Sequence, residues 1–331
     1  MAVTDRTGTM KAVVRNTYAP DVLQLQEIDK PVLADDGVLV RVRAASLNRV
    51  DWYRTTGTPY FARLPTELIK PKPLLLGTDF AGTVEAVGKD AKGFRAGDDV
   101  FGATRGTLAE YVCVPGDGAV VLKPAAVTFE AAAAVPLAAL TALQGLRDHG
   151  QIRSGHKVLI NGASGGVGTF AVQIAKAFGA EVTAVCSTRN VDLARSIGAD
   201  HVIDYTREDF TRSDRRYDLM FDNAGSRSWS ECRRVLEPRA TVVLVGGPKT
   251  NRLIGPLGHI VKMKLAALLG GRKAVFFAAS LNQSDMAVLR ELLESGRVTP
   301  VVERRYELTE IRDALRYMGE GHTQGKIVIS V

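Results

Sequence analysis

Val158-Leu-Ile-Asn-Gly-Ala-Ser-Gly-Gly-Val-Gly168 is an apolar run that breaks into clustered glycines. Such a cluster also marks ordinary turns, so the flanking sequence decides between the two interpretations. Apolar residues recur at helical spacing from Thr169 to Phe178, Gly179 stands where a C-terminal cap belongs, and a second apolar run covers Val182 to Val185. This order of strand, glycine loop, helix and strand predicts a dinucleotide-binding unit.

The glycine positions suggest how the loop holds its ligand. We expect the strand to end near Asn161, Gly165 to turn the backbone toward a pyrophosphate, and Gly168 to let the following helix pack closely. The phosphates then lie at the N-terminus of that helix, where unpaired N–H groups and the helix dipole favour an anion. The candidate contacts in the loop are Ser164, Gly165, Gly166, Val167 and Gly168.

The end of the second strand indicates which cofactor the site prefers. An NAD site usually has Asp or Glu about 20 residues after the glycines, to bind the ribose 2'-hydroxyl. Here Ser187 occupies that place, followed by Thr188 and Arg189. A hydroxyl and a guanidinium can bind a 2'-phosphate that an acid would repel. We therefore expect NADPH, while the alternative is a solvated polar loop.

The rest of the chain predicts a two-domain α/β protein. A length of 331 residues exceeds one typical domain. Short alternating runs at Val38 to Arg43, Gly82 to Val87 and Leu108 to Val112 indicate a mostly β domain before the glycine loop. After Lys157, strands and helices alternate, which predicts six parallel strands. Those strands are expected at Val158–Ile160, Val182–Val185, His201–Ile203, Leu219–Phe221, Thr241–Val245 and Ala274–Ala278.

The final part of the chain repeats the alternation. We expect a helix at Asp285–Ser295, a strand at Val301–Tyr306, a helix at Thr309–Met318 and a strand at Lys326–Ser330. The nine residues before Met10 carry no pattern, and a loose leader is the expectation for them.

Several functional classes find no support in the composition. The longest apolar stretch, Ala131 to Leu143, is too short to span a bilayer, and the N-terminus has no apolar signal core. We therefore expect a cytoplasmic protein. The three cysteines and five histidines are scattered without metal-ligand spacing, so no metal site is expected.

The excess positive charge is concentrated in one segment. The net charge is +7, and the segment from Lys249 to Lys273 has six Lys or Arg residues with no Asp or Glu. An anionic partner and solvated lysines beside a cofactor cleft both explain this segment. Because aromatic residues are not interleaved with these cations, we expect no nucleic acid.

Several motifs in order resemble one family, the zinc-free quinone oxidoreductase branch of the medium-chain dehydrogenases/reductases. The resemblance extends over nearly everything from Met10 onward. Its motifs are Met10-Lys-Ala-Val13, Asn48-Arg-Val-Asp51, Leu76-Gly-Thr-Asp-Phe-Ala-Gly82, Gly97-Asp-Asp-Val-Phe-Gly102, Leu140-Thr-Ala142, Gly162 to Gly168, Gly198-Ala-Asp-His-Val-Ile-Asp-Tyr205 and Gly325-Lys-Ile-Val328.

The resemblance implies a domain plan and further cofactor contacts. Residues 10–125 form a GroES-like catalytic domain, residues 126–278 a Rossmann domain, and residues 279–331 return to the catalytic domain. The active site is expected in the cleft between the two domains, and a homodimer through the edge strand near Phe276 and Phe277. Further expected cofactor contacts are Ser187, Arg189, Tyr205, Asn223, Val245, Gly246, Phe276, Phe277 and Lys326, although a solvated Lys326 is an alternative.

The zinc-dependent relatives differ at the metal. Where they have ligands Cys, His and Cys, this chain has Asn48, Thr78 and Leu137, and no cysteine-rich lobe lies between Gly102 and Glu110. These side chains cannot build a catalytic zinc site. Without a Lewis acid to lower the pKa of the bound alcohol, the site is poorly suited to alcohol oxidation.

A zinc-free site suits hydride delivery to a quinone or an α,β-unsaturated carbonyl, where charge develops on a carbonyl oxygen. Asn48 and Tyr53 are the candidate donors to that oxygen, with Tyr60 behind them and water as the proton source. Packing is an equal alternative for the tyrosines. Asp51 fixes a loop or positions a donor, and Thr141 contacts the nicotinamide or hydrogen-bonds its own helix.

The segment Pro256 to Leu269 has a broad apolar stripe on a predicted helix, with Lys262 and Lys264 off the stripe. Three roles are open: a wall of a hydrophobic substrate site, a dimer interface and a contact with a membrane surface. The leading function is an NADPH-dependent quinone or enone reductase. The alternatives are an enoyl-thioester reductase and an NADPH-binding regulatory or RNA-binding protein.

Overall fold

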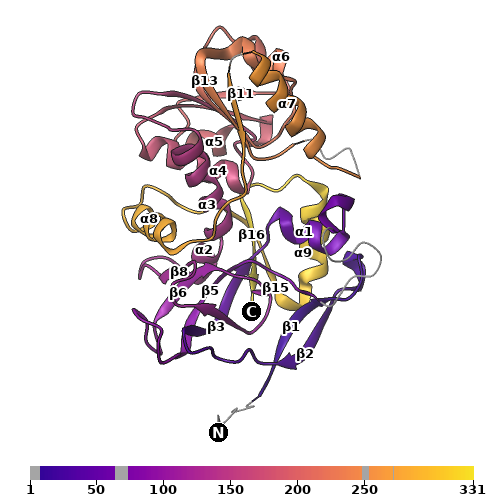
Figure 1. The fold of residues 1–331 in the computed structure, drawn as a ribbon, viewed down its shortest axis with the longest axis vertical. Helices are drawn as coiled ribbons and strands as arrows, with labels where there is room; N and C mark the ends of the chain where they lie inside the picture. Colours follow the sequence, from indigo (N-terminus) through magenta and orange to yellow (C-terminus); the bar gives the residue numbers. More distant parts are fainter. Residues whose placement is uncertain (1–7, 64–73, 248–252, 271) are drawn as a thin grey trace.

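The computed structural model describes residues 8–63, 74–247, 253–270 and 272–331, whose strands form sheets of three, six and seven strands. Figure 1 shows two parts stacked along the long axis. The six strands between Lys157 and Phe276 lie in the upper part, and the strands up to Leu122 lie in the lower part. The yellow C-terminal segment returns to the lower part, so the first and last portions of the chain build it together.

The upper part contains a parallel sheet in the order β11-β10-β9-β12-β13-β14. The order reverses between β9 and β12, which is where open α/β sheets bind their ligands at the carboxyl ends of the strands. This is the predicted six-stranded Rossmann arrangement. Its strands are β9 (Lys157–Asn161), β10 (Glu181–Cys186), β11 (His201–Asp204), β12 (Tyr217–Asp222), β13 (Leu236–Leu244) and β14 (Lys273–Phe276).

An apolar layer covers each face of this sheet. Strand β9 contributes to both layers, because neighbouring residues of a strand point to opposite sides. Val158 and Ile160 of β9 join the larger apolar layer, and Leu159 joins the other. Helices α2 (Phe129–Ala133), α3 (Pro136–Gln144), α4 (Gly166–Ala177), α5 (Val191–Ser196) and α8 (Gln283–Glu294) contribute to the first layer. Helices α6 (Trp229–Cys232) and α7 (Leu257–Leu269) contribute to the second.

The seven-stranded sheet of the lower part has the order β15-β16-β3-β5-β6-β8, with β7 also paired to β3. The C-terminal strand β16 runs antiparallel to β3, with Val328 opposite Ser46. Its strands are β3 (Gly37–Ser46), β5 (Asp79–Val87), β6 (Asp99–Ala103), β7 (Tyr111–Pro115), β8 (Val120–Leu122), β15 (Val302–Glu307) and β16 (Lys326–Ser330).

A small sheet β2-β1-β4 and two helices complete the lower part. Helix α9 packs against α1 and buries Ile311, Leu315 and Met318. The bounds are β1 (Thr9–Arg15), β2 (Gln24–Asp29), β4 (Leu74–Leu75), α1 (Arg49–Thr56) and α9 (Ile311–Glu320).

Several predicted elements needed correction. The strand expected at Ala274–Ala278 ends at Phe276, and the strand expected at Thr241–Val245 begins at Leu236. The strand expected at Leu108 to Val112 begins only at Tyr111, because Leu108 hydrogen-bonds Val13 and Leu76 outside the large sheet. The helix expected from Thr309 begins at Ile311, after a 3-10 turn over Leu308–Glu310. The domain boundaries at 125 and 278 stay a prediction.

Helix α7 turns only part of its predicted stripe inward. It buries Ile260, Met263 and Ala267 against the sheet, while Leu268 and Leu269 are 74% and 90% exposed. No helix in the described ranges combines the length and the apolar character needed to cross a bilayer.

Candidate active site

The glycine loop after β9 forms an open cradle at the start of α4. Gly162 makes the turn in the left-handed region at φ +86°, whereas Gly165 is extended, so the expected turn at Gly165 is wrong. A Cβ atom on Gly168 would lie 2.1 Å from the Gly162 carbonyl oxygen, so the helix packs as closely as predicted. A Cβ on Gly165 would meet nothing nearer than 3.6 Å, which leaves space for a phosphate beside the helix N-terminus.

Buried Asn190 joins three segments around this cradle. Its Nδ2 donates to the Ser164 hydroxyl at 2.8 Å and to the Ser187 hydroxyl at 3.2 Å. Its Oδ1 accepts from the Gln324 amide, and the Gly325 N–H donates to the Ser164 carbonyl at 2.8 Å. The structure therefore brings the glycine loop, the end of β10 and the C-terminal segment together.

The predicted 2'-phosphate residues form an exposed rim. Arg189 is exposed and donates to the His322 carbonyl, while Ser187 is half-buried. Tyr205 follows the neighbouring strand β11 and is 55% exposed. The nearby Asp204 carboxylate accepts from the Thr188 hydroxyl at 2.5 Å, and this hydrogen bond lowers the pKa of Asp204.

The predicted contacts beyond the switch point also lie at strand ends. Asn223 follows β12, and its Nδ2 lies 3.6 Å from the position of a Cβ on Gly165. Val245 and Gly246 follow β13 and donate their N–H groups to the Asp222 carbonyl at 2.9 and 3.3 Å. These residues therefore lie along one edge of the sheet with the glycine loop.

Phe276 and Phe277 lie at the end of edge strand β14. Phe276 is 39% exposed, and the Phe277 ring lies 4.3 Å from the His149 ring, centroid to centroid. A Cβ on Gly145 would come within 3.3 Å of Phe277, so this ring packs against the end of α3.

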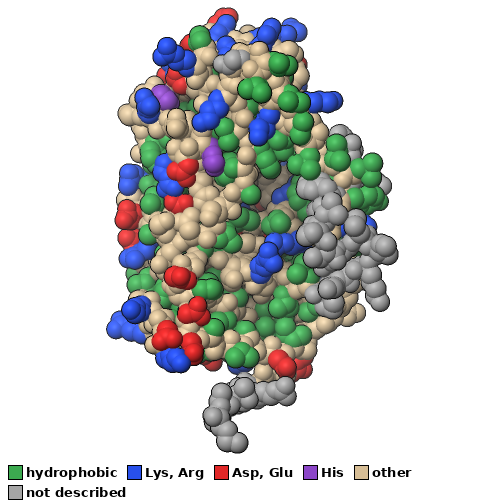
Figure 2. Space-filling view, viewed as in Figure 1, with side chains coloured by type: hydrophobic (Ala, Val, Ile, Leu, Met, Phe, Trp, Pro, Cys, Tyr) green, Lys and Arg blue, Asp and Glu red, His purple; other side chains and the backbone are tan. Residues whose placement is uncertain are grey.

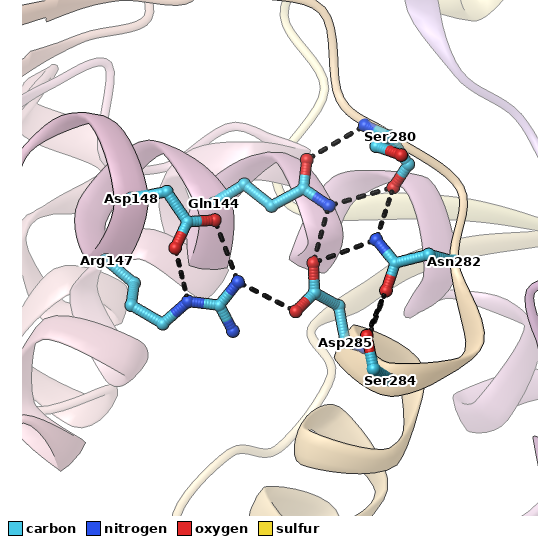
Figure 3. A network of polar contacts seen from close by, with 7 residues as sticks. All are labelled: Gln144, Arg147, Asp148, Ser280, Asn282, Ser284 and Asp285. Carbon is cyan, nitrogen blue, oxygen red and sulfur yellow. Dashed lines mark hydrogen bonds and ion pairs between the residues drawn. The ribbon is translucent and has the colours of Figure 1, made fainter.

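A polar network holds the segment after β14 against the same helix (Figure 3). The Gln144 amide exchanges hydrogen bonds of 2.8 and 2.9 Å with the Ser280 backbone and donates to Asp285. Arg147 reaches the other Asp285 oxygen at 2.7 Å. These contacts fix α3, which carries Thr141, relative to the Rossmann edge.

The centre of the candidate active site is a buried carboxylate, Asp79, at the start of β5. Its Oδ2 accepts from the Ser46 hydroxyl at 2.9 Å, from Asn48 Nδ2 at 2.8 Å and from Lys326 Nζ at 3.2 Å. Its Oδ1 accepts the Leu137 N–H at 2.9 Å, at the N-terminus of α3. The Asp79 carboxylate and the Lys326 ammonium are both buried and hydrogen-bonded, as a stable buried ion pair requires.

Lys326 connects the two parts of the molecule. Its ammonium donates to the Leu47 carbonyl at 3.0 Å and to Asn48 Oδ1 at 2.6 Å, as well as to Asp79. Its carbon chain lies 3.0 Å from the position of a Cβ on Gly166. Because the side chain is 3% exposed, the expectation of a solvated Lys326 is wrong.

These contacts fix the orientation of the Asn48 amide. The Lys326 ammonium donates to Asn48 Oδ1, and Asp79 accepts one of the two hydrogens on Asn48 Nδ2. No acceptor for the second hydrogen occurs among the described residues. A donor held in a fixed direction, at low exposure, is the type of group that stabilises a developing oxyanion.

Asp51 fixes the loop that carries Asn48. Its Oδ2 accepts the Asn48 N–H at 2.8 Å, which closes the first turn of α1, as in the loop-fixing role predicted for it. Its Oδ1 has no hydrogen-bond partner in the part of the chain that the structure describes. Burial raises the pKa of Asp51 to about 6.

The remaining candidates have less specific surroundings. Tyr53 is half-buried on α1, and burial raises its pKa. Tyr60 is 43% exposed, with the Arg63 guanidinium over its ring. The Thr141 hydroxyl donates to the Leu137 carbonyl at 2.7 Å, which is the alternative of a bond to its own helix.

The structure adds two residues to the predicted set, Asp79 and Asn190. Asp79 lies inside the quoted motif Leu76 to Gly82, and a lone acid in an apolar strand is a signal that the sequence contains. Asn190 follows Arg189 directly, but nothing in the sequence distinguishes it from a surface amide.

Figure 2 shows this face hollowed between the two parts, with hydrophobic side chains gathered around the hollow. Lys326 links two groups: the Asn48 amide, a fixed donor in the lower part, and the glycine cradle at the Rossmann sheet, which is suited to an anion. The arrangement can hold a dinucleotide and stabilise negative charge on an acceptor beside it.

Two family models match the chain. One, described as an alcohol dehydrogenase GroES-like domain, matches residues 34–125. The other, described as a zinc-binding dehydrogenase, matches residues 197–329.

Individual proteins match almost the whole chain. It is 34% identical to 2-methylene-furan-3-one reductase of Solanum lycopersicum, over 97% of this chain and 79% of that protein. It is 36% identical to NAD(P)H oxidoreductase RTN4IP1, mitochondrial, of Mus musculus, over 98% of this chain and 90% of that protein. The solved structure of Escherichia coli quinone oxidoreductase complexed with NADPH has a TM-score of 0.81 and 26% identity, covering 97% of this chain and 100% of that one.

These matches agree with the Rossmann sheet, the glycine cradle and the second, mostly antiparallel sheet. The chain therefore belongs to the quinone oxidoreductase-like branch of the medium-chain dehydrogenase/reductase superfamily, and it is a nicotinamide-dependent oxidoreductase.

Proposed function

We propose that this protein is an NADPH-dependent reductase of quinones or α,β-unsaturated carbonyl compounds that works without a metal ion. The fixed Asn48 amide is the observation that carries the proposal. It stands where zinc-dependent relatives place a ligand, and the other two ligand positions hold the Thr78 hydroxyl and the Leu137 side chain. These groups are poor zinc ligands, whereas an amide N–H is a good oxyanion donor.

The chemistry of the acceptor follows from this donor. Bound NADPH would supply hydride chemistry for the electron-poor ring of a quinone or the β-carbon of an enone. The electron pair displaced from the C=C bond ends on the carbonyl oxygen, and the free Asn48 N–H is suited to bind that oxygen. One such donor stabilises the transition state by about 3 kcal/mol.

Water is the proposed source of the final proton. Lys326 already has three acceptors for its three ammonium hydrogens. Asp51 is fully buried and hydrogen-bonded to the Asn48 backbone. Neither group has a proton free for the product oxygen.

The preference for NADPH rests on the rim at the end of β10. Ser187 and Arg189 stand where an NAD site has an acid, and Arg189 is exposed for a phosphate to reach. The Escherichia coli relative bound to NADPH supports this preference. The expected acceptor is small and hydrophobic, because hydrophobic side chains surround the hollow (Figure 2).

We also propose a homodimer that forms through β14. This strand pairs only with β13 among the described strands, so its other edge can pair with a second copy. The cytoplasmic location stays a prediction.

The test is an acceptor panel with NADPH and NADH followed in parallel by absorbance. The panel contains a benzoquinone, a naphthoquinone, an enone, an enoyl thioester and a primary alcohol with the oxidised cofactor. We expect turnover of quinones or enones with NADPH, unaffected by a chelator. Chelator-sensitive oxidation of the alcohol would contradict the metal-free proposal, and dominant turnover of the thioester would establish the enoyl-thioester alternative.

A further inference from the structure

Helix α7 presents large aliphatic side chains to the outside of the molecule. Leu265, Leu268 and Leu269 are 57%, 74% and 90% exposed, and Val261 is 53% exposed. At 3.6 residues per turn these four positions form one stripe, opposite the buried Ile260, Met263 and Ala267. An apolar stripe of this extent on an ordinary surface signals an interaction.

Cations border the stripe on both sides. Helical geometry places Lys262 along one margin and Lys264 along the other, and both side chains are exposed. The sequence around the helix has no compensating charge, because residues 249–273 contain no Asp or Glu. Apolar residues flanked by lysines are the pattern of a helix that lies in a membrane interface.

A basic cavity continues this surface beyond the end of α7. Its volume is about 420 Å³, and Arg233, Arg234 and Arg272 line it with Trp229, Pro238 and Gly270. None of these lining residues is acidic. The Arg272 guanidinium donates to the Arg233 and Leu236 carbonyls at 3.2 and 3.4 Å, whereas the Arg233 and Arg234 side chains are exposed and suit a phosphate group. We call the exposed stripe, its two lysines and this cavity the α7 surface.

The charge distribution discriminates between possible occupants. A second copy bound through a two-fold axis would place the α7 surface against itself, since isologous interfaces pair identical patches. Lys262, Lys264 and their equivalents would then be buried together without a carboxylate from this segment. An anionic bilayer offers both an apolar layer for the leucines and phosphate groups for the cations.

We propose that the α7 surface docks on an anionic lipid bilayer. The leucines insert at the boundary between headgroups and acyl chains, and the lysines and arginines contact lipid phosphates. This proposal needs no turnover, so it stands or falls separately from the proposed function.

The test is co-sedimentation of the full chain with sucrose-loaded vesicles. One set consists of phosphatidylcholine, and the other has about one third phosphatidylglycerol. We expect binding to the anionic vesicles alone, and its loss at high salt. Lys262→Ala and Lys264→Ala should each weaken the partition about fivefold. Leu265→Glu/Leu268→Glu should weaken it more than about tenfold.

A matched control changes two exposed aliphatic residues outside the α7 surface. Val32 and Leu281 are 85% and 41% exposed, so Val32→Glu/Leu281→Glu adds the same charge. This control should bind vesicles almost like the unmodified protein, and thermal melting checks that each variant folds.

Three outcomes would overturn the proposal. They are no binding to anionic vesicles at low salt, equal weakening by the control pair, and binding unaffected by Leu265→Glu/Leu268→Glu. Sedimentation velocity covers the competing occupant. If the α7 variants change only the dimer mass and not vesicle binding, the surface is a contact between copies.

Discussion

The buried centre around Asp79 and the exposed rim around Ser187 both carry polar residues, but they use them differently. At the centre, the Asp79 carboxylate and the Lys326 ammonium are 0% and 3% exposed. Both hydrogen-bond the Asn48 amide, and the Ser46 hydroxyl donates to the carboxylate. At the rim, Arg189 and Tyr205 reach solvent. The centre therefore sets the direction of one donor, while the rim offers adaptable contacts to an anion.

This difference predicts where substitutions have large effects. Leaving a buried charge without its partner costs several kcal/mol, whereas a solvated contact costs little because water replaces it. Substitutions at the centre should therefore have larger effects than substitutions at the rim.

Lys326→Met should have the largest effect on stability. The substitution leaves the Asp79 carboxylate buried without its cation, so the free energy of unfolding should fall by about 3–5 kcal/mol. Urea denaturation measures this change. Lys89→Met is the matched control, because Lys89 and Asp35 pair with both side chains 70% exposed. It should cost less than about 1 kcal/mol.

A double substitution sharpens the same test. Asp79→Asn/Lys326→Met removes both charges, so it should recover part of the stability that Lys326→Met loses. Strictly additive losses would show that the two groups do not interact.

Asn48→Ala should reduce catalysis with little effect on cofactor binding. Removing one oxyanion donor lowers kcat by about 10²–10³. The Kd for NADPH, measured by fluorescence, should stay nearly unchanged, since the glycine cradle lies on a different sheet. Asn282→Ala is the matched control, because Asn282 caps α8 through the Asp285 N–H. It should cost about 1 kcal/mol of stability and leave kcat unaltered.

Asp51→Asn should change how stability depends on pH. The pKa of Asp51 is raised from 3.8 to about 6, so between these values the unfolded chain ionises while the folded chain stays protonated. The free energy of unfolding of the unmodified protein therefore falls over that range, by about 1.4 kcal/mol for each pH unit. The variant should gain about 3 kcal/mol relative to it between about pH 4 and pH 7. A constant difference across this range would contradict the role of burial.

Ser187→Asp and Arg189→Ala should have the smallest effects. Each should raise the KM for NADPH about tenfold, because only NADPH carries the 2'-phosphate. Arg189→Ala should leave the KM for NADH nearly unaltered, whereas Ser187→Asp should lower it, because the new carboxylate can bind the ribose 2'-hydroxyl. Arg195→Ala is the control, since Arg195 pairs with Asp192 on α5. Equal effects on both cofactors would remove the basis for the NADPH preference.

The Rossmann part was highly predictable from sequence. Its central strands β9 and β10 contain continuous buried apolar runs, and Gly162 to Gly168 mark the first crossover. Local pattern therefore determines the elements, and the rule for parallel crossovers limits their order. The C-terminal helices were predictable from apolar residues at helical spacing.

The catalytic centre was less predictable, because its key contacts join distant residues. Lys326 and Asp79 are 247 positions apart, and no local pattern links them. The identity of Asn48 is visible in the sequence, but the direction of its amide depends on both partners. Asn190 is likewise defined by Ser164 and Gln324, which reach it from separate segments.

Strand β16 also has a consequence for synthesis of the chain. Lys326 contacts the Leu47 carbonyl across 279 positions, and β16 pairs with β3. Translation delivers β3 early and β16 after the whole Rossmann unit. During synthesis the end of β3 from Ala44 to Ser46 therefore has no partner on this side until β16 has been made. The glycine loop is made earlier, but its cradle is completed together with the catalytic centre, because Gln324 and Gly325 donate to Asn190 and Ser164.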